Sequence, residues 1–248
     1  MARQGDSVPS RIDQHEAGPL AAGGGDLWVF AYGSLMWRPG FAYAEARRAR
    51  LVGYSRGFCV YSVHYRGTRE HPGLVLGLDR GGACEGIAYR VPSEAARRTL
   101  AYLRARELIT GVYVQTRVSV TLAGPQGRQV SAITFIVERC HPGYAGHLPI
   151  GLQARIIRGA SGGAGANIDY LANTLLHLRQ LSIRERGLER LAGLAGAFRL
   201  IGCAPGESCA STRALTRAWA GKQPRLRRLL PELRRRFVHR VSLGAWRH

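Results

Sequence analysis

The sequence has a single lysine, no paired cysteines and no long apolar run. Lys222 is the only lysine among 36 basic residues, so arginine carries nearly all of the positive charge. The five cysteines form no C-x-x-C pair, and their odd number fits neither a disulfide framework nor a zinc site. No segment approaches the roughly 20 apolar residues that cross a bilayer, and residues 1–18 contain no apolar signal core. We therefore expect a cytoplasmic protein with reduced thiols, without a metal site or a membrane span.

Acidic residues are also scarce, 16 against 36 basic ones, which leaves a formal net charge of +20. Such a surface attracts anions, from small acidic substrates to nucleic acid. Half of the excess lies in residues 196–248, which contain 12 basic and 2 acidic residues. Because Trp219, Phe237 and Trp246 are too scattered to form a stacking platform, we expect a solvated, partly disordered extension and no nucleic-acid partner. The alternative is a basic amphipathic segment that binds nucleic acid or an anionic membrane.

Three parts are expected along the chain. Residues 1–25 are polar and rich in Gly and Ala, which is typical of a disordered leader. Residues 26–195 contain the apolar runs and are expected to form one folded domain, and residues 196–248 form the basic extension. Within the domain the order is strands, one helix, strands and then helices. This order favours an α+β fold over a doubly wound parallel sheet.

Apolar periodicity and turn residues locate the individual elements. Residues 93–107 are expected to form a helix, and residues 112–122 and 130–137 a hairpin. A turn at Gly81-Gly82 is expected to separate two strands, and Asn167 is expected to cap the helix that follows it. The other expected strands are 27–32, 51–61, 74–78 and 84–91, and the other expected helices are 152–160, 168–181 and 183–194.

The first strand ends in a turn that has the composition of a binding loop. Tyr32 is followed by Gly33, Ser34 and Leu35. Gly33 allows a sharp turn and the close approach of a ligand to the backbone. Consecutive free N–H groups at such a turn bind a carboxylate or stabilise an oxyanion. The tetrapeptide alone has a simpler explanation, because many strands end in Gly-Ser for reasons of turn geometry.

Glu107 is the candidate acid or base. It lies at the end of the helix expected over 93–107, on the face that carries Leu100 and Leu103. If it is buried there, its pKa is raised and it can transfer protons near neutral pH. The alternative is a solvated glutamate paired with Arg104 or Arg106, which is how most helical glutamates occur.

The 32–35 turn and Glu107 both belong to a series of motifs that follow one another along the chain. Together they resemble the ChaC family of glutathione-specific γ-glutamylcyclotransferases, over about residues 27–194. The motifs are F-A-Y-G-S-L-M-W-R-P-G-F (30–41), R-L-V-G-Y-S-R (50–56), H-Y-R-G-T (64–68), P-G-L-V-L (72–76), Y-L-R-A-R-E (102–107), G-V-Y (111–113), H-P-G-Y-A-G (141–146), S-G (161–162) and N-I-D-Y-L (167–171).

The resemblance implies a fold, a reaction and a set of site residues. The fold is the γ-glutamylcyclotransferase-like one, a small mixed β-barrel with peripheral helices. The reaction is the cleavage of glutathione to 5-oxoproline and cysteinylglycine without a cofactor. The turn at residues 32–35 matches the loop that holds the γ-glutamyl group, Glu107 matches the catalytic glutamate, and Tyr113 matches a pocket tyrosine. Arg66 and Tyr144 are further candidates for the pocket.

Two other functions stay open at this point. The enzyme could act on a γ-glutamyl amine other than glutathione, because residues that contact the rest of the substrate cannot be placed from the sequence. Alternatively, the domain could be catalytically inert in a nucleic-acid-binding protein that uses the basic extension. The presence of both the 32–35 turn and Glu107 favours the enzyme, because a binding protein needs neither of them.

Overall fold

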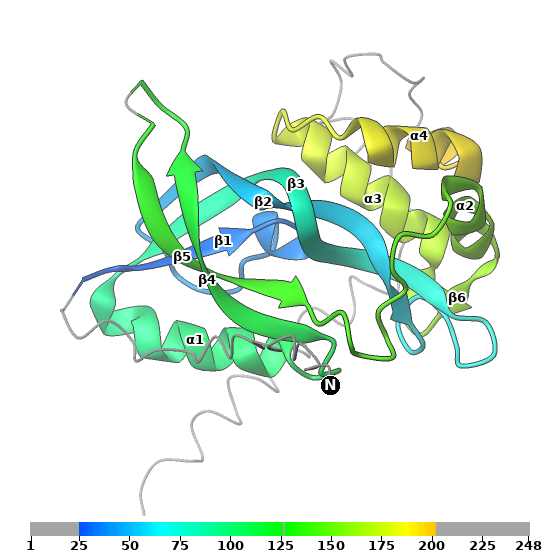
Figure 1. The fold of residues 1–248 in the computed structure, drawn as a ribbon, viewed down its shortest axis with the longest axis horizontal. Helices are drawn as coiled ribbons and strands as arrows, with labels where there is room; N and C mark the ends of the chain where they lie inside the picture. The colour runs from blue at the N-terminus through cyan, green and yellow to red at the C-terminus, as the bar shows by residue number, and fades with distance from the viewer. Residues whose placement is uncertain (1–24, 126, 202–248) are drawn as a thin grey trace, which may run out of the picture.

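The computed structural model describes residues 25–125 and 127–201, and its centre is a closed barrel of five strands (Figure 1). Around the barrel the order is β1-β3-β2-β4-β5. Neighbouring strands are antiparallel except for β5 and β1, whose parallel pairing closes the barrel. The prediction of an α+β fold with a mixed barrel is confirmed. The strands are β1 (Leu27–Ala31), β2 (Glu45–Ser62), β3 (Gly73–Val91), β4 (Tyr113–Leu122) and β5 (Gln129–Val137).

Strand β1 is buried on both faces, which explains its unbroken apolar sequence. Trp28 and Phe30 belong to a cluster that takes side chains from all five strands and from no helix, so this cluster fills the barrel. Val29 and Ala31 point to the opposite face because side chains alternate along a strand. They join a second cluster, which packs the outside of the barrel against the helices.

The glycine pair Gly81-Gly82 does not form the expected turn between two strands. Strand β3 continues through it as one long strand paired with β2, so that prediction is wrong. Both glycines have positive φ and lie opposite Gly53, at a register shift between Val52 and Tyr54. Glycine adopts this left-handed backbone without a steric penalty. The residues therefore form a bulge that bends the long β2–β3 hairpin instead of ending it.

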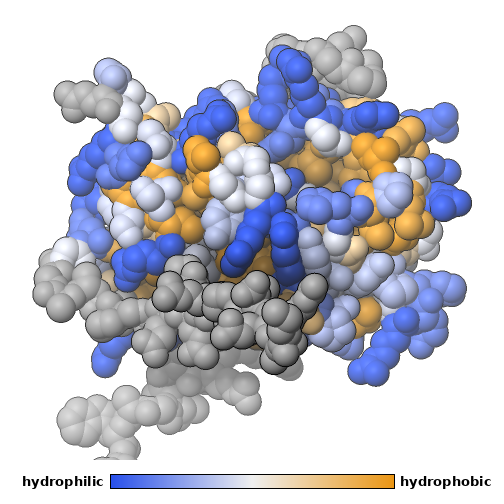
Figure 2. Space-filling model, viewed as in Figure 1, coloured by the Kyte–Doolittle hydropathy of each residue, from blue (hydrophilic) through white to orange (hydrophobic). Residues whose placement is uncertain are grey.

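The helices cover the barrel from two sides (Figure 1). One side carries α1 (Ser93–Glu107), and the other carries a layer of α2 (Ile150–Gly159), α3 (Asn167–Gln180) and α4 (Arg186–Ala195). The short helix α5 (Phe198–Ile201) follows α4, and the 3-10 turn η1 (Ser34–Met36) follows β1. On the face shown in Figure 2, hydrophilic residues surround hydrophobic patches over both the barrel and the helical layer. Along the described ranges, no helix combines the length and apolar character needed to cross a membrane.

Asn167 does not cap α3 as expected. The N-cap position is Ala166, and Asn167 is fully buried. Its side-chain oxygen accepts the N–H of Leu74 at 2.7 Å, and its amide nitrogen donates to the carbonyl of Leu74 at 2.7 Å. The carboxamide thus pairs with a backbone unit at the start of β3 as a neighbouring strand would, and it satisfies two buried polar groups.

The glycine-rich segment before α3 forms a two-stranded hairpin of β6 (Ser161–Gly162) and β7 (Gly165–Ala166). It packs against the loop that joins β2 to β3. The leader expected over residues 1–25 and the basic extension over 196–248 lie outside the described residues, except for residue 25 and residues 196–201.

Candidate active site

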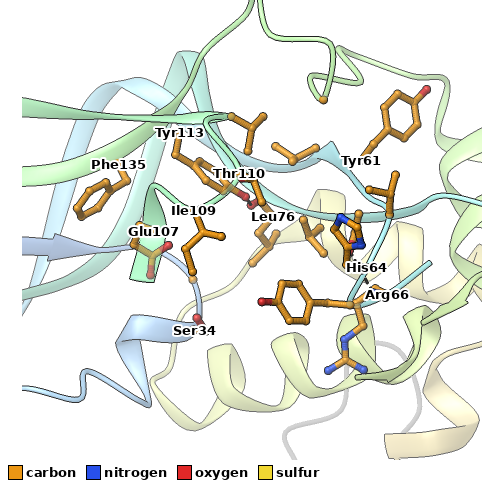
Figure 3. Close-up of a pocket in the computed structure, with 18 of the residues that line it drawn as sticks. Ser34, Tyr61, His64, Arg66, Leu76, Glu107, Ile109, Thr110, Tyr113 and Phe135 are labelled. Atoms are coloured by element: carbon orange, nitrogen blue, oxygen red, sulfur yellow. Dashed lines mark hydrogen bonds between the residues drawn. The ribbon is translucent and has the colours of Figure 1, made fainter. Parts of the chain in front are cut away.

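A cavity of about 990 Å³ opens where β1 ends, and it lies between the end of α1 and the β2–β3 loop (Figure 3). Its size is at the upper end of the range of small-molecule sites, roughly 300–1,000 Å³. Seven of the eight site residues predicted from the sequence line it: Tyr32, Gly33, Ser34, Leu35, Arg66, Glu107 and Tyr113. Further lining residues include Tyr61, His64, Arg69, Leu76, Arg106, Ile109, Thr110, Phe135, His141 and Tyr170.

The turn after β1 leaves backbone donors at the cavity wall. The first N–H of η1 that bonds within the turn is that of Met36, which donates to the carbonyl of Gly33 at 2.9 Å. The N–H groups of Ser34 and Leu35 precede this bond, as the first donors of a helical turn do. Leu35 and Met36 are buried, which anchors the turn in the core. The turn therefore has the composition of an anion-binding loop, and the residues that carry these first N–H groups line the cavity.

A buried arginine of β2 holds the first residue of this turn. The Arg56 side chain is fully buried; its Nε donates to the carbonyl of Tyr32 and its Nη2 to the carbonyl of Glu85, each at 2.5 Å. Its Nη1 forms an ion pair with Glu185, just before α4. One guanidinium thus connects the residue that follows β1, strand β3 and the residue that precedes α4.

Glu107 lies on the cavity wall at the last residue of α1. Its side chain is 21% exposed, on the same face as the buried Leu100 and Leu103. Burial raises the pKa of this carboxyl, and the positive charge of Arg106 acts in the opposite direction. Glu107 therefore has one feature of each alternative that the sequence offered. It is paired with Arg106, as a solvated glutamate would be, yet its side chain is largely removed from water.

Three tyrosines lie close enough to this carboxylate for its charge to act on them. Burial raises the pKa of Tyr32 and Tyr113 well above the usual phenol value and that of Tyr170 to about 12, and the nearby Glu107 charge adds to each increase. All three phenols are therefore protonated at neutral pH and can donate hydrogen bonds. The hydroxyl of Tyr113 donates to the carbonyl of Leu76 at 2.7 Å, which fixes the ring in the wall.

The family model for ChaC-like proteins matches residues 27–196, which include every residue that lines the cavity. The chain belongs to the ChaC-like family. Its sequence is 40% identical over 167 residues to a glutathione-specific γ-glutamylcyclotransferase of Escherichia coli, covering 67% of this chain and 71% of that protein. It is 35% identical over 173 residues to the human glutathione-specific γ-glutamylcyclotransferase 1, covering 69% and 78%.

The barrel of this ChaC-like protein also resembles a solved structure. The crystal structure of a glutathione-specific γ-glutamylcyclotransferase from yeast superposes with a TM-score of 0.63 at 22% sequence identity. The superposition covers 70% of this chain and 97% of the yeast chain. At this identity the likeness establishes the fold, which agrees with the mixed barrel and peripheral helices described above.

Tyr144, the eighth residue predicted from the sequence, lies apart from the others. It is absent from the cavity lining of this ChaC-like protein, and its hydroxyl donates to Asp79 at 2.5 Å. Asp79 also pairs with Arg139. Burial and the bond to Asp79 raise the pKa of Tyr144 to about 12. The residue pairs with Val60 of β2 through an isolated bridge, so it connects the 141–146 loop to the barrel.

Arg106 is the residue that sequence reasoning missed. The sequence indicates it only as a partner of a solvated Glu107, whereas in the structure it connects Glu107 to the turn after β1. Its Nε lies 3.0 Å from Glu107 Oε1, its Nη2 donates to Ser34 Oγ at 2.9 Å, and its Nη1 donates to the carbonyl of Arg38 at 2.8 Å. No spacing rule signals a contact across 72 positions, between a helix end and the turn after β1.

Proposed function

We propose that this ChaC-like protein cleaves glutathione to 5-oxoproline and cysteinylglycine, with Glu107 as its acid–base group. The observation that carries the proposal is the bridge formed by Arg106, whose guanidinium contacts both the Glu107 carboxylate and Ser34 of the backbone turn. One small ligand in the cavity can therefore touch the proton acceptor and the anion-binding turn together. The activities named for the E. coli and human relatives support glutathione as the substrate.

The proposed chemistry is an intramolecular acyl transfer. The α-amine of the γ-glutamyl group attacks its own γ-carbonyl carbon, which forms the five-membered ring and breaks the bond to the cysteine nitrogen. Because nucleophile and electrophile belong to one molecule, a well-oriented closure avoids on the order of 7–11 kcal/mol of the barrier. Both reacting groups come from the substrate, so the step needs neither a nucleophilic side chain nor a cofactor.

Proton transfer is the part of the reaction that requires Glu107. The α-amine is an ammonium ion at neutral pH: it must lose one proton before it attacks and a second one as the ring amide forms. The leaving cysteine nitrogen must gain one proton to depart as an amine, and the other proton is released to water or binds this amine. A carboxylate whose pKa is raised by burial can accept the first proton and return it to the leaving nitrogen. The N–H groups of Ser34 and Leu35 are the proposed donors to the oxyanion.

The cytoplasm is the proposed compartment, because glutathione keeps protein thiols reduced there. The test is to incubate the full chain with glutathione or with γ-glutamyl-alanine and to measure 5-oxoproline. We expect 5-oxoproline from glutathione at the higher kcat/KM. Preference for γ-glutamyl-alanine would identify another γ-glutamyl amine as the substrate class. No product from either compound would refute the enzymatic proposal and favour the nucleic-acid-binding alternative.

Replacing Ser34 by alanine removes the hydroxyl that accepts a hydrogen bond from Arg106. We expect KM for glutathione to rise roughly 3- to 10-fold, the effect of one hydrogen bond, while kcat changes less. Steady-state kinetics of 5-oxoproline formation measure both constants. A loss of kcat larger than that of the Glu107→Gln variant would reverse the relative importance of the two residues.

Replacing Arg106 by methionine removes the charge that lowers the pKa of Glu107. The carboxyl pKa then rises further, so the ionised base is lost at a higher pH. We expect the acid limb of the kcat/KM profile to move to higher pH, because this profile reports groups of the free enzyme. Arg104→Met is the matched control, since Arg104 lies on the same helix and donates to Gln115 instead. An unmoved limb would exclude Glu107 as the titrating base.

A further inference from the structure

Polar side chains lie at two opposite ends of the cavity (Figure 3). Glu107 and Ser34 lie at one end, and His64 and Arg66 lie at the other, with Leu76 between them. Glutathione likewise carries charge at both ends, because its γ-glutamyl group has an ammonium and a carboxylate and its glycine has a second carboxylate. If the γ-glutamyl group binds beside Glu107, as proposed above, the glycine points toward Arg66.

Arg66 has the features of a preformed carboxylate receptor. Its guanidinium lies over the ring of Tyr170, with the Cζ atom 5.4 Å from the ring centroid, and its Nη1 donates to the carbonyl of Ala166 at 3.2 Å. Within the described ranges no carboxylate forms an ion pair with it, although the charge of Asp169 acts on it from farther away. Its remaining N–H groups are thus available to an anionic ligand, and a planar guanidinium matches a carboxylate.

The loop that carries Arg66 is held in place by its own backbone. The N–H groups of Gly163 and Ala164 donate to the carbonyls of His64 and Tyr65 at 2.9 and 2.8 Å, and the Arg66 N–H donates to Ser62 Oγ at 3.0 Å. The β6–β7 hairpin and this loop approach each other so closely that a Cβ on Gly162 would lie 2.6 Å from the backbone nitrogen of Gly67. A receptor fixed before binding loses little entropy when the ligand arrives.

Arg69 is the other arginine of this loop on the cavity wall. It differs from Arg66 in its exposure and in the contacts that hold the side chain. Arg69 is exposed, whereas Arg66 is half-buried and fixed by a hydrogen bond and an aromatic ring. The pKa of Arg66 is lowered by burial, yet an arginine remains charged at neutral pH. A charge that is partly removed from water interacts more strongly with a bound carboxylate than an exposed charge does.

We propose that Arg66 binds the glycine carboxylate of glutathione and so selects γ-glutamyl substrates that end in a free carboxylate. This inference rests on the proposed function, because it assumes that the γ-glutamyl group lies beside Glu107. It assigns Arg66 to the leaving half of the substrate. The α-carboxylate of the γ-glutamyl group is left to the backbone turn at the opposite end.

The test compares glutathione with glutathione esterified by ethanol at its glycine carboxylate. The ester keeps the γ-glutamyl group and loses only the glycine charge. In the wild type we expect a higher KM for the ester. Arg66→Gln is expected to raise KM for glutathione roughly 10-fold or more, the effect of a charge-assisted hydrogen bond, with kcat nearly kept and KM for the ester nearly unchanged. The α1 surface variant Arg98→Gln is the matched control, and Arg69→Gln tests whether the other arginine of the cavity wall is the receptor instead.

Binding to the Glu107→Gln variant gives a readout that does not depend on turnover. Calorimetry with glutathione and with the ester, with and without Arg66→Gln, should show the same selective loss of affinity for glutathione. Equal losses for both ligands would place Arg66 on the γ-glutamyl carboxylate or in a structural role, and a selective loss in Arg69→Gln alone would identify the wrong arginine. Either result overturns the inference, whereas absence of 5-oxoproline from the wild type overturns the proposed function itself.

Discussion

Replacing Glu107 by glutamine is expected to lower kcat for 5-oxoproline formation at least 100-fold, the lower limit for removal of a general acid–base group. Glutamine keeps the size and hydrogen-bonding capacity of the side chain but cannot accept the proton of the substrate ammonium. Because the carboxyl is 21% exposed and its pKa is raised by burial, the neutral amide should be accommodated without loss of stability. Affinity for glutathione should therefore be largely retained.

The control for this variant is Glu94→Gln, in the first turn of the same helix α1. Glu94 is exposed and lies outside the cavity lining, so its replacement should leave kcat unchanged. Steady-state kinetics and calorimetry with glutathione measure turnover and binding separately. An unchanged kcat in Glu107→Gln would remove the glutamate from the mechanism. A loss of binding equal to the loss of kcat would assign it to substrate binding instead.

Arg56→Met is expected to destabilise the protein by about 3–5 kcal/mol, as the removal of one partner from a buried ion pair does. The Arg56 side chain is fully buried, and its loss leaves Glu185 and the carbonyl of Tyr32 without their donor. Urea denaturation measures the change in the free energy of unfolding. The turn that begins at Tyr32 loses its support as well, so KM for glutathione should also rise.

The control is Arg48→Met on the same strand. Arg48 pairs with Glu85 at 2.8 Å, but both side chains are 44% exposed, so the expected loss is below about 1 kcal/mol.

The pair Arg56–Glu185 also predicts a pH effect. Burial raises the pKa of Glu185 and Arg56 opposes this, so in Arg56→Met the carboxyl pKa rises further. The destabilisation should therefore shrink as the pH falls, because Glu185 becomes neutral. Equal losses in the free energy of unfolding for Arg56→Met and Arg48→Met would contradict this account.

Local sequence patterns predicted the elements that depend on local physics. The apolar run of β1 and the hairpin of β4 and β5 are found where periodicity and turn residues placed them. The stripe of Leu100 and Leu103 predicted the buried face on which Glu107 lies. These predictions hold because a residue's preference for strand, helix or turn and the side that it buries follow from its immediate neighbours.

The errors have a common cause in long-range partners. Gly81-Gly82 is a strong local turn signal, yet its pairing with the facing Gly53 turns it into a bulge. Asn167 is a good helix cap by composition, yet the unpaired backbone of Leu74 uses its carboxamide instead. In both cases a residue from elsewhere in the chain outweighs the local preference, and no periodicity reports what a distant segment will offer.

The sequence by itself determined the α+β class, the identity of the 32–35 turn and of Glu107, and the family to which the chain is related. Only the tertiary structure decided that Arg106 connects this turn to Glu107 and that Arg66 lies at the far end of the same cavity. The physical reason is closure of the barrel. The parallel pairing of β5 with β1 closes the barrel, and α1 packs on one side of it, so that side chains more than 70 positions apart meet. The hydrophobic pattern of a segment shows which of its faces is buried but not which distant segment covers that face.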